Sequence, residues 1–319
     1  MNRLFLPEEY KLLSDCKLCP RECGVNRFEG GNGYCGTDAG MNIASVCVHK
    51  GEEPVISGTE GICNIFFTGC NLRCIFCQNH EISRPGNSFA RNNLSFDEIL
   101  ESIEKILLSG VKALGFVSPS HAVPQMKAII RGLHEKGLKP VLVYNTNGYD
   151  KPDVIDSLDG IIDVYLPDYK YASPHIAREF SDASDYPEVV LKALKRMYYQ
   201  KGSKLLLDDD EKAVSGLLIR HLVLPGHAEE SIKVLRVIAD ELSTGVHISL
   251  MSQYHPIPDV LNHSDLNRSL YFSEYAEVAE EMQRIGFRNG WLQDMESNNN
   301  YKPDFSKEHP FEQGDRLQT

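Results

Sequence analysis

Apolar runs of strand length alternate with amphipathic helical segments along most of this 319-residue chain. Each run is almost continuously apolar, which is typical of parallel strands that are covered on both faces. We expect strands at residues 62–68, 111–117, 140–145, 161–166, 217–224 and 246–251. Helical patterns lie at residues 96–108, 123–136, 187–199, 229–242 and 271–285. This alternation predicts an α/β fold, in the form of a partial (β/α)6 TIM-type barrel.

Polar side chains follow the predicted strands at their carboxyl ends, where βα barrels carry their chemistry. These candidates are Ser118, Ser120, Asn145, Asn147, Asp168, Lys170, Gln253 and His255. Turn residues are common at strand ends in any protein. Here polar residues recur after several strands of the same predicted barrel, and this recurrence predicts a binding site. Arg220 interrupts the fifth apolar run, and a charge inside a barrel strand is costly unless it is paired. Its planar guanidinium suits a carboxylate of a substrate or cofactor.

Composition narrows the class of protein. A net charge of −12 and the lack of a basic run argue against a nucleic-acid-binding surface. The first residues lack the apolar stretch of a signal peptide or a membrane span, so we expect neither. Nine cysteines without such a signal favour metal-bound thiolates over a disulfide scaffold. We therefore expect a cytoplasmic protein.

The chain divides into three expected regions. Residues 1–58 form an N-terminal metal-binding segment and a lead-in, and residues 59–295 form the barrel. Residues 296–319 form a polar, extended tail, which Phe305 and Phe311 would anchor to the barrel.

Three cysteines with the spacing Cys70-x3-Cys74-x2-Cys77 follow the first predicted strand. A [4Fe–4S] cluster has four irons to ligate, and a loop with three thiolates leaves one iron open for an outside ligand. A structural zinc site usually has four ligands. The spacing therefore favours a [4Fe–4S] cluster with an open position, held by these three residues.

The loop, with the aromatic Phe76 before its last cysteine, resembles the signature of the radical S-adenosylmethionine (SAM) superfamily. The resemblance implies that SAM chelates the open iron through its amino and carboxylate groups. It also implies that the reduced cluster cleaves SAM to methionine and a 5′-deoxyadenosyl radical, which abstracts a hydrogen atom. Such an oxidoreductase needs a reducing partner such as flavodoxin or ferredoxin. The same resemblance implies an open barrel of six βα units.

Almost the whole chain resembles the pyruvate formate-lyase-activating-enzyme group, especially its branch with an N-terminal four-cysteine segment. The motifs that carry this resemblance, besides the cysteine loop through Gln78-Asn79, are Cys19-Pro20-Arg21-Glu22-Cys23-Gly24-Val25-Asn26-Arg27, Tyr144-Asn145-Thr146-Asn147-Gly148-Tyr149, Tyr165-Leu166-Pro167-Asp168-Tyr169-Lys170-Tyr171 and Arg220-His221-Leu222-Val223-Leu224-Pro225-Gly226. The resemblance implies that Asp168 and Lys170 contact SAM and that Asn147 borders the ribose. It places His255, with Gln253 beside it, near the adenosine.

The chain departs from that group at three places. Ser118-Pro119-Ser120-His121 replaces the Gly-Gly-Glu-Pro turn that binds the SAM amino group, although the serine hydroxyls can still accept an ammonium donor. His121 is then either a helix cap or a ligand contact. Asn145 stands where activating enzymes carry an acidic residue that helps hold a monovalent cation, so the resemblance does not carry that cation site over to this chain. The stretch 79–95 is too short for the ferredoxin-like insert of some activases.

A second set of cysteines, Cys16-x2-Cys19-x3-Cys23-x11-Cys35, precedes the barrel. Four thiolates suit a closed zinc site or a second iron–sulfur cluster, and the sequence leaves both open. The segment is short and glycine-rich, so it would depend on a metal for order. We interpret the two remaining cysteines, Cys47 and Cys63, as small buried apolar residues.

The favoured interpretation is a radical SAM enzyme, and its substrate stays open. If the chain is an activase, its substrate is a glycyl-radical protein. The alternative substrate is a small-molecule metabolite. A third interpretation is an iron–sulfur electron carrier or sensor without SAM chemistry. It is disfavoured because a three-cysteine loop followed by Asp168 and Lys170 has no use in simple electron transfer.

Overall fold

The computed structural model describes residues 4–85, 94–295, 303–305, 307 and 310–311. Over these residues one nine-stranded sheet runs in the order β1-β2-β3-β4-β5-β7-β8-β9, with β6 paired to β7. The strands are β1 (Ile43–His49), β2 (Ile62–Phe67), β3 (Ala113–Val117), β4 (Val141–Thr146), β5 (Val164–Pro167), β6 (Leu206–Leu207), β7 (Ala213–Leu222), β8 (His247–Met251) and β9 (Gly290–Leu292). All neighbours on the path pair parallel except β1 with β2, and β6 pairs antiparallel with β7.

All six predicted strands are present in the predicted order, and the chain folds as a partial TIM-type barrel. The pattern of apolar runs did not predict β1, β6 or β9. β1 mixes buried with partly exposed positions, and Ser45 interrupts its apolar residues, so this edge strand lacks a continuous apolar run. β6 and β9 have only two and three residues. Because β1 is hydrogen-bonded to β2, the sheet begins inside the predicted lead-in.

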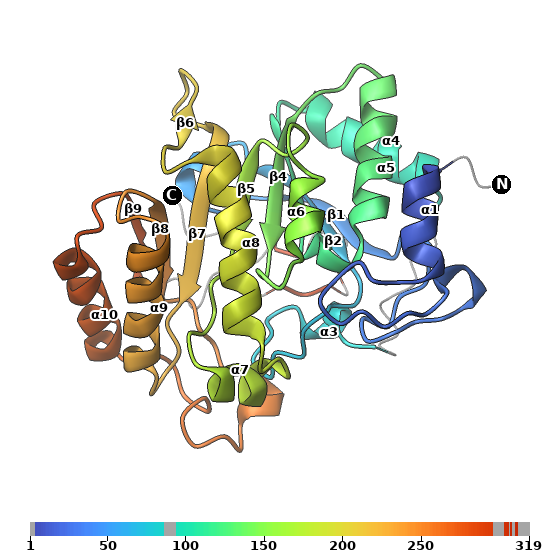
Figure 1. Ribbon diagram of the computed structural model, residues 1–319. Coiled ribbons are helices and arrows are strands. Elements are labelled where there is room, and N and C mark those ends of the chain that lie inside the picture. The colour runs from blue at the N-terminus through green and yellow to red at the C-terminus, as the bar shows by residue number, and fades with distance from the viewer. Residues whose placement is uncertain (1–3, 86–93, 296–302, 306, 308–309, 312–319) are drawn as a thin grey trace.

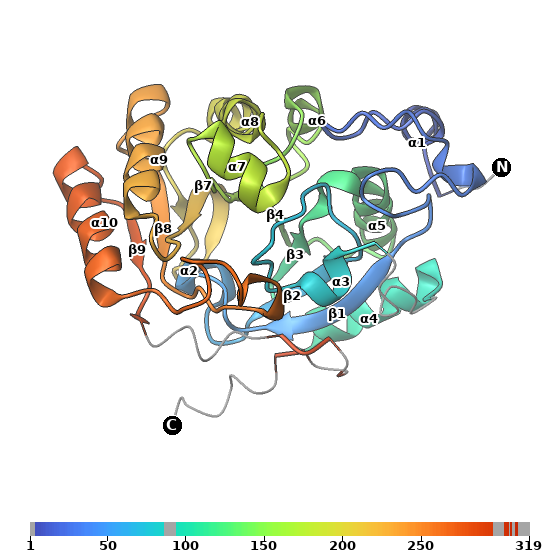
Figure 2. The same cartoon turned by 90° about the horizontal axis from the view of Figure 1, so that it is seen from below.

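The longer helices lie around the outside of the curved sheet (Figures 1 and 2). The helices are α1 (Pro7–Ser14), α2 (Pro54–Ser57), α3 (His80–Ser83), α4 (Phe96–Leu108), α5 (Val123–Glu135), α6 (Pro152–Asp156), α7 (Pro174–Ser181), α8 (Tyr186–Lys201), α9 (Ala228–Glu241) and α10 (Phe272–Ile285). α4 begins at a capping box, in which the Glu98 amide donates to Ser95 Oγ over 3.2 Å and the Ser95 amide donates to Glu98 Oε2 over 2.7 Å. Helix α4 therefore has the predicted bounds.

The barrel interior has an apolar floor. Val55 and Ile56 of α2 pack in one buried cluster with residues of β2, β4, β5 and β7, namely Ile62, Val143, Val164, Leu166, Ala213 and Leu218. Side chains of successive residues alternate between the two faces of a strand. The polar residues Asn64 and Arg220 lie two positions after Ile62 and Leu218 of this floor, toward the carboxyl ends of their strands. The interior is therefore closed below and polar above.

The described part of the tail packs on β2, as the sequence predicts. The rings of Phe305 and Phe311 lie 5.3 Å and 5.6 Å from the ring of Phe66, measured between centroids. Most of the predicted extended segment 296–319 lies outside the described residues. Cys47 and Cys63 are buried free thiols, as predicted. Among the described helices, none has the length and hydropathy needed to cross a membrane.

Candidate active site

The loop that carries Cys70, Cys74 and Cys77 follows β2 at the carboxyl end of the strands. Its first turn requires glycine, because Gly69 has a φ of +75° and a Cβ there would lie 2.3 Å from the Cys35 carbonyl oxygen. Beyond that turn, two amides of the loop donate to carbonyl oxygens at the end of α7. The loop is therefore held between the N-terminal segment and α7.

Each thiol of this loop has a hydrogen-bonding partner. Cys70 Sγ accepts from the Leu72 amide and from Asn147 Nδ2, both over 3.4 Å. Ser181 Oγ donates to Cys74 Sγ over 3.0 Å, and Ser83 Oγ lies 3.5 Å from Cys77 Sγ. Such donors stabilise thiolate ligands and tune the potential of a cluster. Burial raises the pKa of Cys70 to about 12, so a metal is needed to hold it as a thiolate near neutral pH.

Lys170 and Asp168 form an ion pair beside this loop, with Nζ and Oδ2 2.6 Å apart. Both side chains are mostly buried. Burial alone would lower the pKa of Lys170, but Asp168 and the nearby Cys74 outweigh it and keep that pKa above its usual value. The ammonium of Lys170 therefore stays charged between the loop and the barrel interior.

Arg220 reaches across the interior from β7. Its Nε donates to Asp168 Oδ1 over 2.9 Å, and its Nη2 donates to Asn145 Oδ1 over 2.6 Å. Its Nη1 lies 3.2 Å from Glu52 Oε2. The pairing that a buried charge requires is thus present. The protein itself supplies these carboxylates, and the role of Arg220 in binding a carboxylate of a substrate or cofactor stays a prediction.

Glu52 and Glu53, which sequence reasoning did not single out, bring two further carboxyl groups into the interior from the turn before α2. Glu52 Oε1 also accepts from Asn64 Nδ2 over 2.9 Å. Burial raises the pKa of Glu53, and Glu53 Oε2 has no hydrogen-bonding partner among the described residues. Adjacent acidic residues before a proline ordinarily mark the start of a helix, so the sequence carried no signal for their place in the barrel.

Asn147 lies against the cysteine loop, and its Nδ2 donates to Asn71 Oδ1 over 2.8 Å as well as to Cys70. The next residue, Gly148, has a φ of +80°, and a Cβ there would lie 2.4 Å from the Asp168 carbonyl oxygen. The turn after β4 can approach the turn after β5 only because that residue is glycine. The structure therefore brings Asn147, Asp168, Lys170 and Arg220 together beside the loop.

The remaining predicted residues lie in the segments that follow β2, β3 and β8. Phe76 is buried, with its ring centroid 6.2 Å from that of Tyr254. Ser118 has a left-handed backbone. Ser120 Oγ lies 3.0 Å from Thr146 Oγ1 in a buried hydrogen bond. Gln253 Oε1 accepts from Gln293, and the His255 carbonyl accepts from Gln78 of the cysteine loop.

His121 does not cap a helix, because Ala122 is the N-cap residue of α5. Its ring Nε2 lies 2.8 Å from the Thr68 carbonyl oxygen, and its own carbonyl accepts from Arg27 Nη1 over 2.7 Å. Burial lowers the pKa of His121 to about 4, so the ring is neutral at pH 7. Of the two roles that the sequence left open, helix capping is therefore wrong, and His121 joins the turn after β2 to the N-terminal segment.

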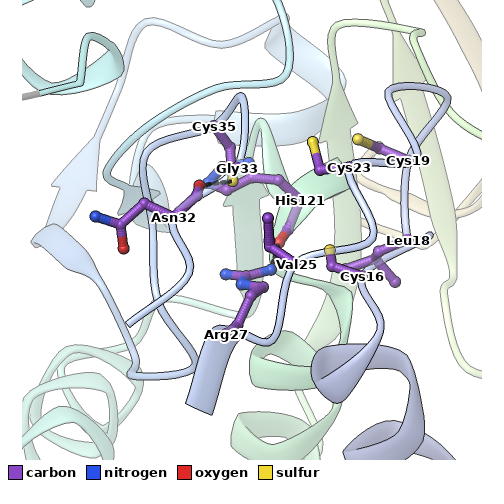
Figure 3. Close-up of a pocket in the computed structure, with 10 residues that line it drawn as sticks. All are labelled: Cys16, Leu18, Cys19, Cys23, Val25, Arg27, Asn32, Gly33, Cys35 and His121. Carbon is purple, nitrogen blue, oxygen red and sulfur yellow. Dashed lines mark hydrogen bonds between the residues drawn. The ribbon is translucent and has the colours of Figure 1, made fainter. Parts of the chain in front are cut away.

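The four N-terminal cysteines line one pocket, together with Arg27 and His121 (Figure 3). The Tyr34 amide donates to Cys23 Sγ over 3.3 Å, and Thr37 Oγ1 lies 3.2 Å from Cys35 Sγ. Donors to sulfur are what a thiolate ligand set requires. Within the described residues, no group of three or more His, Cys, Asp or Glu side chains is arranged closely enough to hold a single metal ion, and this applies to both cysteine sets.

The chain is similar in sequence to several known proteins. An uncharacterised protein of Methanocaldococcus jannaschii is 27% identical over 277 residues, which are 84% of this chain and 74% of the relative. The 7-carboxy-7-deazaguanine synthase of Methanopyrus kandleri is 24% identical over 54% of this chain and 71% of its own length.

Among solved structures, Streptococcus suis SuiB bound to S-adenosylmethionine matches with a TM-score of 0.47 and 13% identity. That match covers 70% of this chain and 48% of SuiB, so the chain spans about half the length of SuiB. In sequence, the family model of the radical SAM superfamily matches residues 64–236, which is more than half of the chain. The protein belongs to the radical SAM superfamily, whose members use a [4Fe–4S] cluster and SAM.

Proposed function

We propose that Cys70, Cys74 and Cys77 hold a [4Fe–4S] cluster at which the protein cleaves SAM and abstracts a hydrogen atom from a substrate. The observation that carries this proposal is that all three thiols come from one loop and each has a hydrogen-bonding partner. When bound, the reduced cluster supplies one electron that breaks the S–C5′ bond of SAM, giving methionine and a 5′-deoxyadenosyl radical that takes the hydrogen atom. We propose flavodoxin or ferredoxin as the source of that electron.

The residues around the loop are suited to orient SAM. The ammonium of Lys170 can bind a carboxylate or a hydroxyl, and its pair Asp168 can accept a hydrogen bond. Asn147, on the adjacent turn, can border the ribose, and Gln253 and His255 follow β8, where the His255 carbonyl accepts from Gln78 of the cysteine loop. We assign these residues, with Phe76, Ser118 and Ser120, to the SAM site.

We propose an activase of a glycyl-radical protein as the first candidate for the physiological role, because the resemblance to the activating-enzyme group extends over almost the whole chain. A small-molecule substrate is the second candidate. It is favoured by the closed floor of the barrel and by the buried charged groups of Glu52, Asp168 and Arg220 beneath the loop. Buried charged groups of this kind suit a compact polar molecule.

Anaerobic reconstitution with iron and sulfide tests the proposal. We expect the reduced protein to convert SAM to methionine and 5′-deoxyadenosine. The protein substrate to test is a glycyl-radical protein encoded by a neighbouring gene, with its glycine deuterated. It should transfer deuterium to 5′-deoxyadenosine and acquire a glycyl radical visible by electron paramagnetic resonance (EPR). Transfer from a metabolite instead would favour the second candidate. A reconstituted protein that holds the cluster but never cleaves SAM would contradict the proposal.

Replacing Lys170 by alanine should weaken SAM binding about ten- to a hundredfold. The substitution removes a charge-assisted hydrogen bond, which contributes roughly 1.5–3 kcal/mol. Titration with SAM measures the dissociation constant, and the absorption spectrum of the cluster should not change. Lys192→Ala is the matched control, because Lys192 pairs with Glu188 on the surface. Equal SAM dissociation constants for Lys170→Ala and the parent would remove Lys170 from the site.

A further inference from the structure

The N-terminal four-cysteine segment is in direct contact with the radical SAM loop. The Cys35 carbonyl oxygen lies against Gly69, where a side chain would not fit. Arg73, inside the loop, donates through Nη2 to the Tyr34 carbonyl and through Nη1 to the Cys70 carbonyl, the latter over 3.0 Å. One guanidinium therefore binds a residue next to Cys35 in one cysteine set and Cys70 in the other.

The ring of Tyr34 lies between two guanidinium groups. Cζ of Arg21 is 3.8 Å from the centroid of this ring, and Cζ of Arg73 is 4.1 Å from it. Both distances are within the range of a cation–π interaction. The Tyr34 hydroxyl donates to Asp182 Oδ2 over 2.7 Å, at the end of α7. Tyr34 is therefore clamped by one arginine from each cysteine region.

The clamp also reaches the backbone of the radical SAM loop. Arg21, which lies between Cys19 and Cys23, donates through Nε to the Asn71 carbonyl over 3.0 Å and through Nη2 to the Asp182 carbonyl over 2.7 Å. Asn71 directly follows Cys70 and binds Asn147. A displacement of Arg21 would therefore shift the backbone of the radical SAM loop next to Cys70.

Tyr34 is equally tied to the four-cysteine pocket, because it precedes Cys35 and its amide donates to Cys23 Sγ. Between α1 and β1 the described chain has one regular element, the 3-10 turn η1 (Arg27–Glu29). A segment with so little secondary structure gains its order from side-chain contacts and from a bound metal. The position of Tyr34 thus depends on what the four thiols hold.

We propose that a thiolate-bound metal centre at Cys16, Cys19, Cys23 and Cys35 fixes the conformation of the radical SAM loop, with Tyr34 as the positioning residue between them. This inference rests on the proposed function, since it requires the cluster at Cys70. Four thiolates carry the same net charge around Zn²⁺ as around an oxidised [4Fe–4S] core, and either centre would tie the four cysteines together, although zinc would require the thiols to move closer together than they lie in this structure. The N-terminal centre acts through packing and needs no electron transfer.

The identity of the N-terminal metal is tested first, in a variant in which Cys70, Cys74 and Cys77 are all alanine. After reconstitution in the presence of zinc and iron, only the N-terminal site can be filled. About one zinc per chain without visible absorption supports the proposal, as do about four irons with sulfide. A folded variant that binds neither metal would overturn it.

Coupling is tested by Tyr34→Leu in the full-length, reconstituted protein. We expect the metal content to match the parent, because the four thiols and the amide donor remain. The SAM dissociation constant should rise about tenfold, the scale of a lost cation–π clamp, and the EPR signal of the reduced radical SAM cluster should broaden. Tyr34→Phe keeps the ring between the arginines and should stay close to the parent. Tyr10→Leu is the matched control, because Tyr10 stacks on Phe28 in the same N-terminal region.

Replacing all four N-terminal cysteines by serine should reproduce the effect of Tyr34→Leu on SAM binding and on the EPR signal. Tyr34→Leu carries the test by itself if the serine variant does not fold. The inference falls if Tyr34→Leu binds SAM as the parent does and has an unchanged EPR signal. The proposed function survives that result, because it fails only if the parent has no Cys70-dependent cluster or does not cleave SAM.

Discussion

Substituting alanine for Cys70, Cys74 and Cys77 together should abolish SAM cleavage and remove about four irons and four sulfides per chain. The three thiols lie on one loop, and each has a hydrogen-bonding partner that suits a thiolate ligand. Without them no ligand set for an open cluster remains beside Lys170. Iron and sulfide analysis after anaerobic reconstitution, together with the yield of 5′-deoxyadenosine, measures the effect.

Cys47→Ala is the matched control for this triple variant. Cys47 is a buried free thiol of β1 that faces the core, apart from both cysteine sets. Its substitution should leave the iron content and the SAM cleavage unchanged. A triple variant that keeps the parent's iron and sulfide and still cleaves SAM would show that the cluster is held elsewhere.

The sequence predicted the barrel because its strands are buried on both faces. Their apolar runs are long enough to be distinct from the amphipathic helices between them, and the bounds of α4 follow from the Ser95 capping box. β1, at an edge of the sheet, mixes buried with partly exposed positions and leaves a weaker signal. The strand ends of a parallel sheet meet at one edge, so the turns with Asn147, Asp168 and Lys170 were predicted to lie together.

The contacts inside the barrel could not be predicted in the same way. The cost of a buried charge predicts that Arg220 must have a partner. It does not predict that Glu52 is one of those partners. These residues are separated by 168 positions, and no local pattern connects them. The contacts of Arg21 and Arg73 with Tyr34 could not be predicted either, because the two arginines belong to different loops that come together only in the folded chain.

Arg220→Met should destabilise the reconstituted protein by about 3–5 kcal/mol near neutral pH. Methionine has a similar length but no charge, so Glu52 would be left as a buried carboxyl group without its ion-pair partner, and Asp168 would keep Lys170 alone. Denaturation under anaerobic conditions, followed by the loss of secondary structure, measures the change in the free energy of unfolding. The double variant Arg220→Met/Glu52→Gln should recover part of the loss, because Glu52 has Arg220 as its ion-pair partner, whereas Asp168 keeps Lys170.

The destabilisation should depend on pH. Burial alone would raise the pKa of Asp168, but Arg220 and Lys170 outweigh it and hold that pKa below its usual value. In the parent this pairing stabilises the fold above the unfolded-state pKa of about 4, and the contribution is lost as the pH falls through the lower folded-state pKa. In Arg220→Met the carboxyl group can be protonated at higher pH. The difference between variant and parent should therefore shrink as the pH falls from about 7 toward about 4.

Arg196→Met provides the comparison, because Arg196 pairs with Asp156 on the surface with both side chains largely exposed. Exposed pairs contribute little, so this variant should lose no more than about 1 kcal/mol at any pH. If Arg220→Met and Arg196→Met cost the same, the interior ion cluster does not hold the barrel together. The charges beneath the cysteine loop would then be screened by water that enters the barrel from its mouth, and Asp168 would behave as a surface carboxylate.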